Sequence, residues 1–548
     1  MKKLLGKKSN ISPGVKASIA FFLASVLTHG ISYLVTPIYT RILSSEEYGQ
    51  TSVYLTWLQI FGIIAMFCLS YGVFNNGMMD HKDKRDEYSF SMLMLSNIIT
   101  LSFSAVLLSL YPLFKEYLNL QLPFIILMCV TFLFQPAYNF WVARQRYELK
   151  YKKTVIFSIG SAILSPTVAV ICILKFNGSK LYSRIFGAEI VLIAMYIGFY
   201  IYLLIKSKGK IKVKYWKEAL LFNLPLIPHY LSTYLLGSSD KLMISYLVSD
   251  SATAYYSIAY SVAALAMIVW TAVNSSLVPY TYEKCKEKDY KAVAAVVNPI
   301  LFMFAIISVL IIMLAPEVVA IMAAADYKEA IYAIPPIVGG VFFQVHYYIY
   351  ANVVYYYKKP KYVMIGSITA MVLNIVLNYF FIKWYGYIAA GYTTLFCYFI
   401  QATIDHIAMR KVVGQKVYNM KIIGLMSLIV IAVSLLSNLL YDYIIVRYVI
   451  IGVIFILCII FRKKVIGLFK MLRSKKESPK PQTDGVAGGD DTVADDVATG
   501  NADNDNNDET PNDGVTEDEH TDVTSSSADI EANESDGSSS VTDESVKG

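Results

Sequence analysis

The chain has 548 residues, of which 56% are hydrophobic, and its mean hydropathy is +0.49. A soluble globular domain uses roughly 45–50% apolar residues, so this composition excludes an ordinary soluble protein. The formal net charge of +7 combines two opposite regions, because residues 481–548 carry 20 acidic residues and one basic residue, whereas the rest carries 47 basic and 21 acidic residues.

Long apolar runs recur from residue 17 to residue 461. Runs of about 20 apolar residues are long enough to cross a bilayer core roughly 30 Å thick as helices. Backbone polar groups in lipid must be satisfied within helices or a closed barrel, and these runs do not alternate as barrel strands do. We therefore predict an all-α polytopic membrane protein with about 14 transmembrane helices. The spans are expected at about 17–40, 50–74, 89–111, 122–142, 154–175, 184–205, 219–246, 254–280, 292–315, 329–356, 363–383, 387–408, 422–441 and 446–461.

The distribution of Lys and Arg between these spans predicts the orientation of the chain. With the N-terminus in the cytoplasm, 38 basic residues fall on the cytoplasmic side and eight fall in the outer loops. Cytoplasmic loops carry an excess of Lys and Arg, so an even number of spans with both termini cytoplasmic is favoured. The basic loops then determine topology, and no nucleic-acid partner is expected.

The sequence lacks the motifs that carry nucleotide or metal chemistry. It contains no Walker A, H-E-x-x-H or G-x-G-x-x-G pattern, and its outer loops are too short to form a catalytic domain. We therefore expect no enzyme activity, no metal site and no cofactor.

Two similar segments lie 200 residues apart, in the first and the seventh predicted spans. "HGISYLVTPIYTR" begins at His29 and ends at Arg41, and "HYLSTYLLGSSDK" begins at His229 and ends at Lys241. Six spans separate the two copies, so both run in the same direction across the membrane. This arrangement predicts two pseudo-symmetric six-helix lobes, one of the repeat types of transporters.

Helical spacing places the polar residues of each copy on one face. A polar face on a membrane helix points to protein or water, so two alternatives remain open: a helix–helix packing seam and a water-filled cavity. Proline residues in both spans are expected to bend the helices. Glu189 is a further charge, one or two turns inside the outer end of its span and within reach of Arg184. The candidate residues of a substrate cavity are His29, Ser32, Arg41, His229, Ser232, Asp240, Lys241, Asn274, Gln344 and His346.

Asp240 and Lys241 lie in the outer part of the seventh span, where one expectation is a lysine that reaches the interface beside a counter-ion. The alternative hypothesis is that Arg41 and Lys241 create a positive field at the cavity mouth, while Asp240 positions a neighbouring helix. Adjacent residues on a helix point about 100° apart, so Asp240 and Lys241 are poorly oriented to pair with each other.

Two stretches carry a family resemblance. "YLVTPIYTRILSSEEYGQTSVY" and "LLFNLPLIPHYLSTYLLGSSDKLMISYLVSDSATAYYSIAY" resemble the first-span and seventh-span signatures of polysaccharide-repeat-unit flippases of the Wzx type, in the MOP exporter superfamily. The resemblance implies two six-helix lobes around a central cavity, with two additional helices. It also implies movement of a lipid-diphosphate-linked oligosaccharide, of the undecaprenyl-diphosphate type, from the inner to the outer leaflet of a bacterial cell membrane.

The resemblance and the span pattern together predict seven segments. These are a cytoplasmic N-terminus (1–16), the first lobe (17–205), a basic linker (206–218), the second lobe (219–408), two additional helices (409–461), a basic juxtamembrane segment (462–480) and an acidic tail (481–548). The tail has few large apolar residues and is expected to be disordered. Its expected partners are polysaccharide assembly proteins, and the spans contact membrane lipids. Two rival functions remain: a multidrug antiporter of the same superfamily and a membrane-embedded glycan polymerase.

Overall fold

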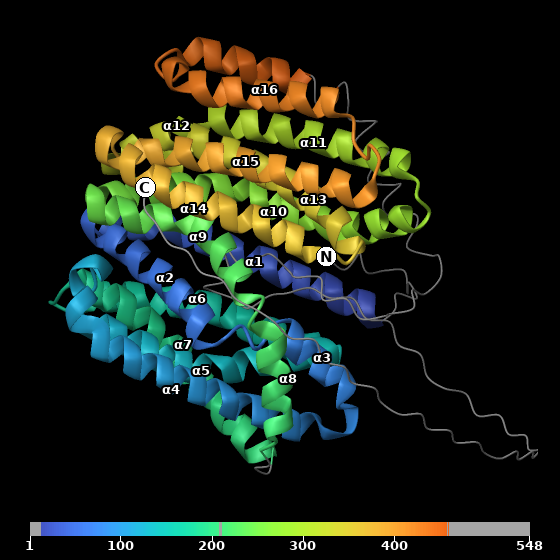
Figure 1. The fold of residues 1–548 in the computed structure, drawn as a ribbon. Coiled ribbons are helices and arrows are strands. Elements are labelled where there is room, and N and C mark those ends of the chain that lie inside the picture. Colours follow the sequence, from blue (N-terminus) through green and yellow to red (C-terminus); the bar gives the residue numbers. More distant parts are fainter. Residues whose placement is uncertain (1–12, 208–210, 457–458, 460–548) are drawn as a thin grey trace, which may run out of the picture. The chain divides into compact units, whose positions relative to one another are not determined.

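The computed structural model describes residues 13–207, 211–456 and 459, and their fold is helical (Figure 1). The predicted juxtamembrane segment and acidic tail, like most of the N-terminal segment, lie outside the described residues. The first half contains α1 (Pro13–Ile42), α2 (Ser45–Ala65), α3 (Gly72–Asp80), α4 (Arg85–Leu118), α5 (Leu122–Tyr147), α6 (Tyr151–Lys175) and α7 (Lys180–Ser207). The second half contains α8 (Val213–Asn223), α9 (Ile227–Leu247), α10 (Asp250–Lys286), α11 (Tyr290–Met313), α12 (Ala315–Met322), α13 (Ile334–Tyr356), α14 (Pro360–Tyr385), α15 (Tyr387–Val413) and α16 (Met420–Leu436).

Among the described residues, ten helices are long and apolar enough to cross a membrane, and the bent pair of α8 and α9 makes eleven. The other three predicted spans coincide with α2 and α15, which carry more polar residues, and with a shorter apolar helix, Ile444–Ile456. Short 3₁₀ segments, Ala325–Ala333 before α13 and Ser437–Leu440 after α16, complete two of the spans. The chain is therefore a multi-pass membrane protein with the predicted fold class.

The two halves repeat the same packing. In the first half α1 packs on α6, α6 on α7, and α5 on α7. In the second half the helices six spans later make the same pairs, because α9 packs on α14, α14 on α15, and α13 on α15. This correspondence confirms the two pseudo-symmetric lobes. Figure 1 shows the two additional helices beside α11.

Two spans are broken. The seventh span bends by 49° between α8 and α9, where Pro225 lacks the N–H that would continue the helix and Pro228 is the second residue of α9. This confirms the predicted bend. The second span breaks between α2 and α3, where Phe67 and Cys68 adopt positive φ angles of 54° and 49°. The break was not predicted, because the segment contains no proline and its only glycine is the first residue of α3.

The two breaks meet in space. The Asn223 side chain donates a hydrogen bond of 3.0 Å to the carbonyl oxygen of Phe67. Beside it, the rings of Tyr71 and Tyr230 pack edge to face with centroids 5.4 Å apart. A polar side chain thus satisfies a backbone group that the break leaves without a helical partner.

The segment that joins the lobes is fastened to the first lobe. Lys212 forms an ion pair of 2.6 Å with Glu87, whose carboxylate raises the pKa of the Lys212 ammonium. Trp216 donates a hydrogen bond of 2.8 Å to the carbonyl oxygen of Ser91. Helix α8 therefore packs against α3 and α4, although the predicted second lobe includes part of it.

Candidate functional site

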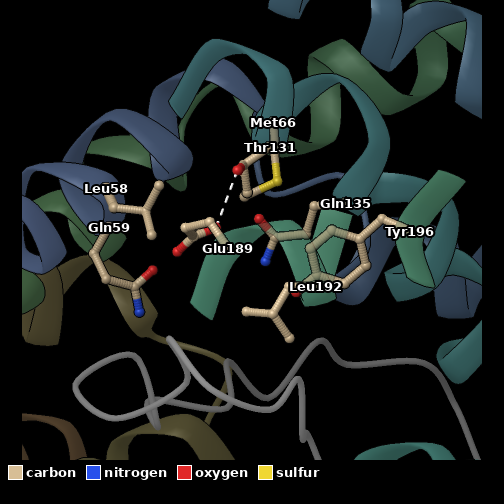
Figure 2. Close-up of a pocket in the computed structure, with 8 residues that line it drawn as sticks. All are labelled: Leu58, Gln59, Met66, Thr131, Gln135, Glu189, Leu192 and Tyr196. Carbon is tan, nitrogen blue, oxygen red and sulfur yellow. Dashed lines mark hydrogen bonds between the residues drawn. The ribbon is translucent and has the colours of Figure 1, made fainter. Parts of the chain in front are cut away.

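A small polar pocket lies inside the first lobe, between α2, α5 and α7 (Figure 2). Its volume of about 10 Å³ is roughly the space of one water molecule. The lining residues are Leu58, Gln59, Met66, Thr131, Gln135, Glu189, Leu192 and Tyr196.

Glu189 on α7 is the charged residue of this pocket. It is only 4% exposed, and its carboxylate accepts a hydrogen bond of 3.2 Å from the Thr131 hydroxyl. In Figure 2 the Glu189 side chain lies between the side-chain amides of Gln59 and Gln135. An acidic group in a membrane span is costly unless it is paired or functional, and such groups mark ion or proton pathways. The pocket can therefore hold a proton, a water molecule or a small cation next to the carboxylate.

The sequence marked Glu189 as a charge in a span but did not place it among the cavity candidates. Its partners come from helices distant in the chain, and no local pattern reveals Thr131 or Gln59 as neighbours. The guanidinium of Arg184, which the sequence placed within reach of Glu189, lies 3.9 Å from the ring centroid of Tyr39.

A second polar cluster lies inside the second lobe, around Asp240. The carboxylate is fully buried and accepts hydrogen bonds from Tyr256 (2.5 Å), Asn378 (2.6 Å) and Thr394 (2.7 Å). These partners come from α10, α14 and α15, so a single side chain on α9 connects four helices. Asn374 extends the cluster, because it accepts a hydrogen bond from Asn378 and donates one to Thr394.

The polar face of α9 is enclosed by protein. His229 and Ser232 are 6% and 1% exposed, and the Ser367 hydroxyl lies 3.5 Å from Nδ1 of His229. Ser232 donates a hydrogen bond to the carbonyl oxygen of His229 within the same helix. In this conformation the face forms a helix–helix seam with α14, which is one of the two alternatives that the sequence left open.

The corresponding face of α1 is more open. Ser32 and Arg41 are exposed, and His29 is half-buried. The hydroxyl of Ser32 and the guanidinium of Arg41 donate to backbone carbonyls one turn earlier, those of Thr28 and Pro37. The two sequence copies thus occupy equivalent helices in different environments.

The remaining candidates are distributed over the second lobe. Lys241 is half-buried, and its ammonium lies 5.1 Å from the ring centroid of Tyr260. Gln344 and His346 are buried on α13, where Nδ1 of His346 lies 2.9 Å from the carbonyl oxygen of Phe342. Asn274 on α10 accepts a hydrogen bond of 2.9 Å from Asn352. None of the ten candidates is among the residues that line the pocket beside Glu189.

The sequence is similar to known protein families and to a protein of Haemophilus influenzae. Residues 15–285 match the family model described as polysaccharide biosynthesis protein, and residues 225–380 match the MatE model. The chain is 23% identical over 383 residues to the Lsg locus putative protein 1 of Haemophilus influenzae, which covers 66% of this chain and 89% of that protein.

Two solved structures share the fold. The Lipid II flippase MurJ in its inward closed conformation has a TM-score of 0.58 and 15% identity, and covers 82% of this chain and 100% of its own. A multidrug resistance MATE family transporter in its inward-facing conformation has a TM-score of 0.54 and 14% identity, with 72% and 94% coverage.

The chain therefore has the fold of the MOP superfamily of membrane transporters. The match to the polysaccharide biosynthesis model and the similarity to the Lsg locus protein agree with the expected resemblance to polysaccharide flippases of the Wzx type.

Proposed function

We propose that the protein moves lipid-diphosphate-linked oligosaccharide repeat units from the inner to the outer leaflet for surface polysaccharide export. The observation that carries this proposal is the match of residues 15–285 to the polysaccharide biosynthesis family, on a fold shared with a lipid flippase. The two lobes alternate access to the two leaflets by rocking against each other. The membrane is the bacterial cell membrane, and both termini are cytoplasmic.

Arg41 and Lys241 have equivalent places in the two lobes and attract the diphosphate of the cargo. Arg41 lies in the last turn of α1, which leads into α2, and Lys241 lies in the second half of α9, which leads into α10 and ends at Leu247. Neither residue is fully buried. Two cations at one end of the path create a positive field for a group with several negative charges. The histidine, serine and amide candidates line the path in the conformations that carry cargo, and Asp240 positions helices.

The decisive experiment measures leaflet accessibility of a lipid-linked oligosaccharide in proteoliposomes that contain only this protein. Transport without ATP is expected, because the chain has no nucleotide motif. Arg41→Ala and Lys241→Ala should each lower the rate at normal protein level, and Lys241→Arg should lower it less. The matched control is Lys217→Ala, on the linker helix α8.

A multidrug antiporter is the second candidate, because residues 225–380 match the MatE model. Export of cationic dyes by the same proteoliposomes, with no movement of the lipid-linked glycan under any gradient, would establish this alternative. If both alanine variants transported the glycan at the wild-type rate, the flippase function would stand, but the proposed role of Arg41 and Lys241 would be wrong.

A further inference from the structure

Six basic side chains gather at one end of the second lobe, where α13 turns into α14 and α15 turns into α16. The Nζ atom of Lys411 lies 5.7 Å from the ring centroid of Tyr362, so the two turns are neighbours. No Asp or Glu occurs in residues 357–364 or 406–421. We name as the basic patch the residues Lys358, Lys359, Lys361, Arg410, Lys411 and Lys416.

Among the described residues, the basic patch has no acidic partner, whereas cations at the corresponding end of the first lobe do. All six patch residues are exposed, and within the part of the chain that the structure describes none of them forms an ion pair. In the first lobe, Arg144 and Lys150 both pair with Glu148, at 2.7 and 2.5 Å. Cations that gather without counter-charges create a positive field that attracts anions. The patch therefore fits a partner that carries several negative charges.

The chain carries a segment of this kind after its last described helix. Residues 484–505 contain seven aspartates and no Lys or Arg, and we name them the acidic segment. Residues 457–483 connect that helix to the acidic segment, and a chain of this length can extend for up to about 90 Å. The acidic segment can therefore reach the basic residues at the end of the second lobe where the helix ends.

The last described helix runs back toward the basic patch. Helix α16 begins at Met420, directly after the patch, and leads to the far end of α11, where Arg447 donates a hydrogen bond of 2.8 Å to the carbonyl oxygen of Met313. Residues 441–443 reverse the chain before the helix Ile444–Ile456. The chain therefore leaves this helix at the end of the second lobe where the patch lies.

We propose that the acidic segment docks on the basic patch of the same molecule. A covalently attached segment has a high effective concentration at its site, so it binds there ahead of a free anion with the same charge. Single exposed ion pairs contribute little, and the contact therefore depends on the number of charges and not on one fixed geometry. The docked segment covers the patch and competes there with the phosphates of lipid headgroups. This docking does not depend on what the protein transports.

Zero-length cross-linking tests the docking in the full-length protein, held as one copy per phosphatidylcholine nanodisc so that two copies cannot react. A carbodiimide joins a carboxylate to an amine only where the two groups are in contact. Peptide mass spectrometry should find amide bonds from aspartates of the acidic segment to Lys358, Lys359, Lys361, Lys411 or Lys416. The matched control is Lys214, which is exposed but lies 3.9 Å from Glu218, and its cross-links to the acidic segment should be far fewer.

Three outcomes of this experiment would overturn the proposal. They are an absence of cross-links from the acidic segment, equal cross-linking to Lys214 and to the patch lysines, and cross-links confined to the basic residues of 462–480. The last outcome would mean that the acidic segment pairs with the chain next to it and leaves the patch uncovered.

An exchange of charges separates docking from side effects of substitution. Lys358→Glu/Lys359→Glu/Lys361→Glu should lose most of the cross-links, and adding Asp490→Lys/Asp491→Lys should restore them with the amine and the carboxylate exchanged. Raising the salt from about 0.1 M to about 1 M should lower the yield in both proteins, because the screening length falls from about 10 Å to about 3 Å. Size-exclusion profiles identify variants that fold. A folded exchange variant without restored cross-links, or a yield that salt leaves unchanged, would show that the two regions do not dock.

Discussion

The Asp240 carboxylate accepts hydrogen bonds from three side chains on three different helices. A buried charged acceptor is tolerated when its lone pairs are satisfied in this way. Removal of the carboxylate leaves three buried donors without their acceptor. Each orphaned donor costs about 1–3 kcal/mol, so the consequence is a loss of stability and not only of charge.

We therefore expect Asp240→Ala to lower the thermal unfolding temperature of the purified protein in detergent by several degrees. Asp240→Asn should lose less, because its amide oxygen can still accept from Tyr256 or Thr394. The control is Thr403→Ala, which removes an exposed hydroxyl bonded only within its own helix. Equal melting temperatures for Asp240→Ala and Thr403→Ala would show that the cluster does not hold the second lobe together.

Glu189 has a different environment, because half-buried amides and a small pocket adjoin its carboxylate. We expect Glu189→Gln to fold normally but to lose the dependence of glycan transport on an ion or proton gradient. The amide keeps the hydrogen bond with Thr131 but cannot exchange a proton or balance a cation. Transport rates with and without a gradient check this, with Glu218→Gln on the exposed face of α8 as control. A normal gradient response in Glu189→Gln would place coupling elsewhere.

At the scale of elements, Arg447 fastens the last described helix to the second lobe. Its guanidinium forms two hydrogen bonds of 2.9 Å with Glu317 on α12 and one of 2.8 Å with the carbonyl oxygen of Met313. Partial burial alone would raise the pKa of Glu317, but hydrogen bonds from Arg447 and Tyr448 hold that pKa below its ordinary value. The stabilisation is therefore complete above the ordinary carboxyl pKa, about 4.3, and is lost as the pH falls through the lower folded pKa.

Arg447→Met should lower the melting temperature at pH 7. The difference in melting temperature between the variant and the wild type should become smaller as the pH falls below about 4. At neutral pH the substitution should lower the free energy of unfolding by about 1.5–3 kcal/mol, the range for hydrogen bonds to charged groups. Thermal unfolding across this pH range measures both effects. If the melting temperature of Arg447→Met stayed below that of the wild type by the same amount at every pH, packing and not the charge pair would hold the helix Ile444–Ile456 in place.

The sequence predicts those helices and bends whose causes are local. The membrane spans follow from apolar runs, and the bend between α8 and α9 follows from Pro225 and Pro228. The break at Phe67 leaves no such mark, because it depends on Asn223 from a distant span. Two of the Asp240 partners, Asn378 and Thr394, were hidden for the same reason, because hydrogen bonds between residues 138 or more positions apart cannot be read from helical spacing.

For the whole molecule, the acidic tail should be dispensable for folding. Its composition cannot bury enough apolar surface to offset the entropy of ordering. Truncation after Lys480 should therefore give a protein with an unchanged size-exclusion profile and melting temperature in detergent. Aggregation of the truncated protein, but not of a variant with a scrambled tail, would show that tail length or charge is needed for a stable protein.

The fastening of α8 to the first lobe has a consequence for how the chain can be divided. The bonds from Lys212 and Trp216 to α4 do not depend on the peptide link before them. Two fragments separated between residues 207 and 211, produced together in one cell, should therefore find each other and restore glycan export. A division between α8 and α9 would leave the second fragment without these docking contacts, and it should complement far less well.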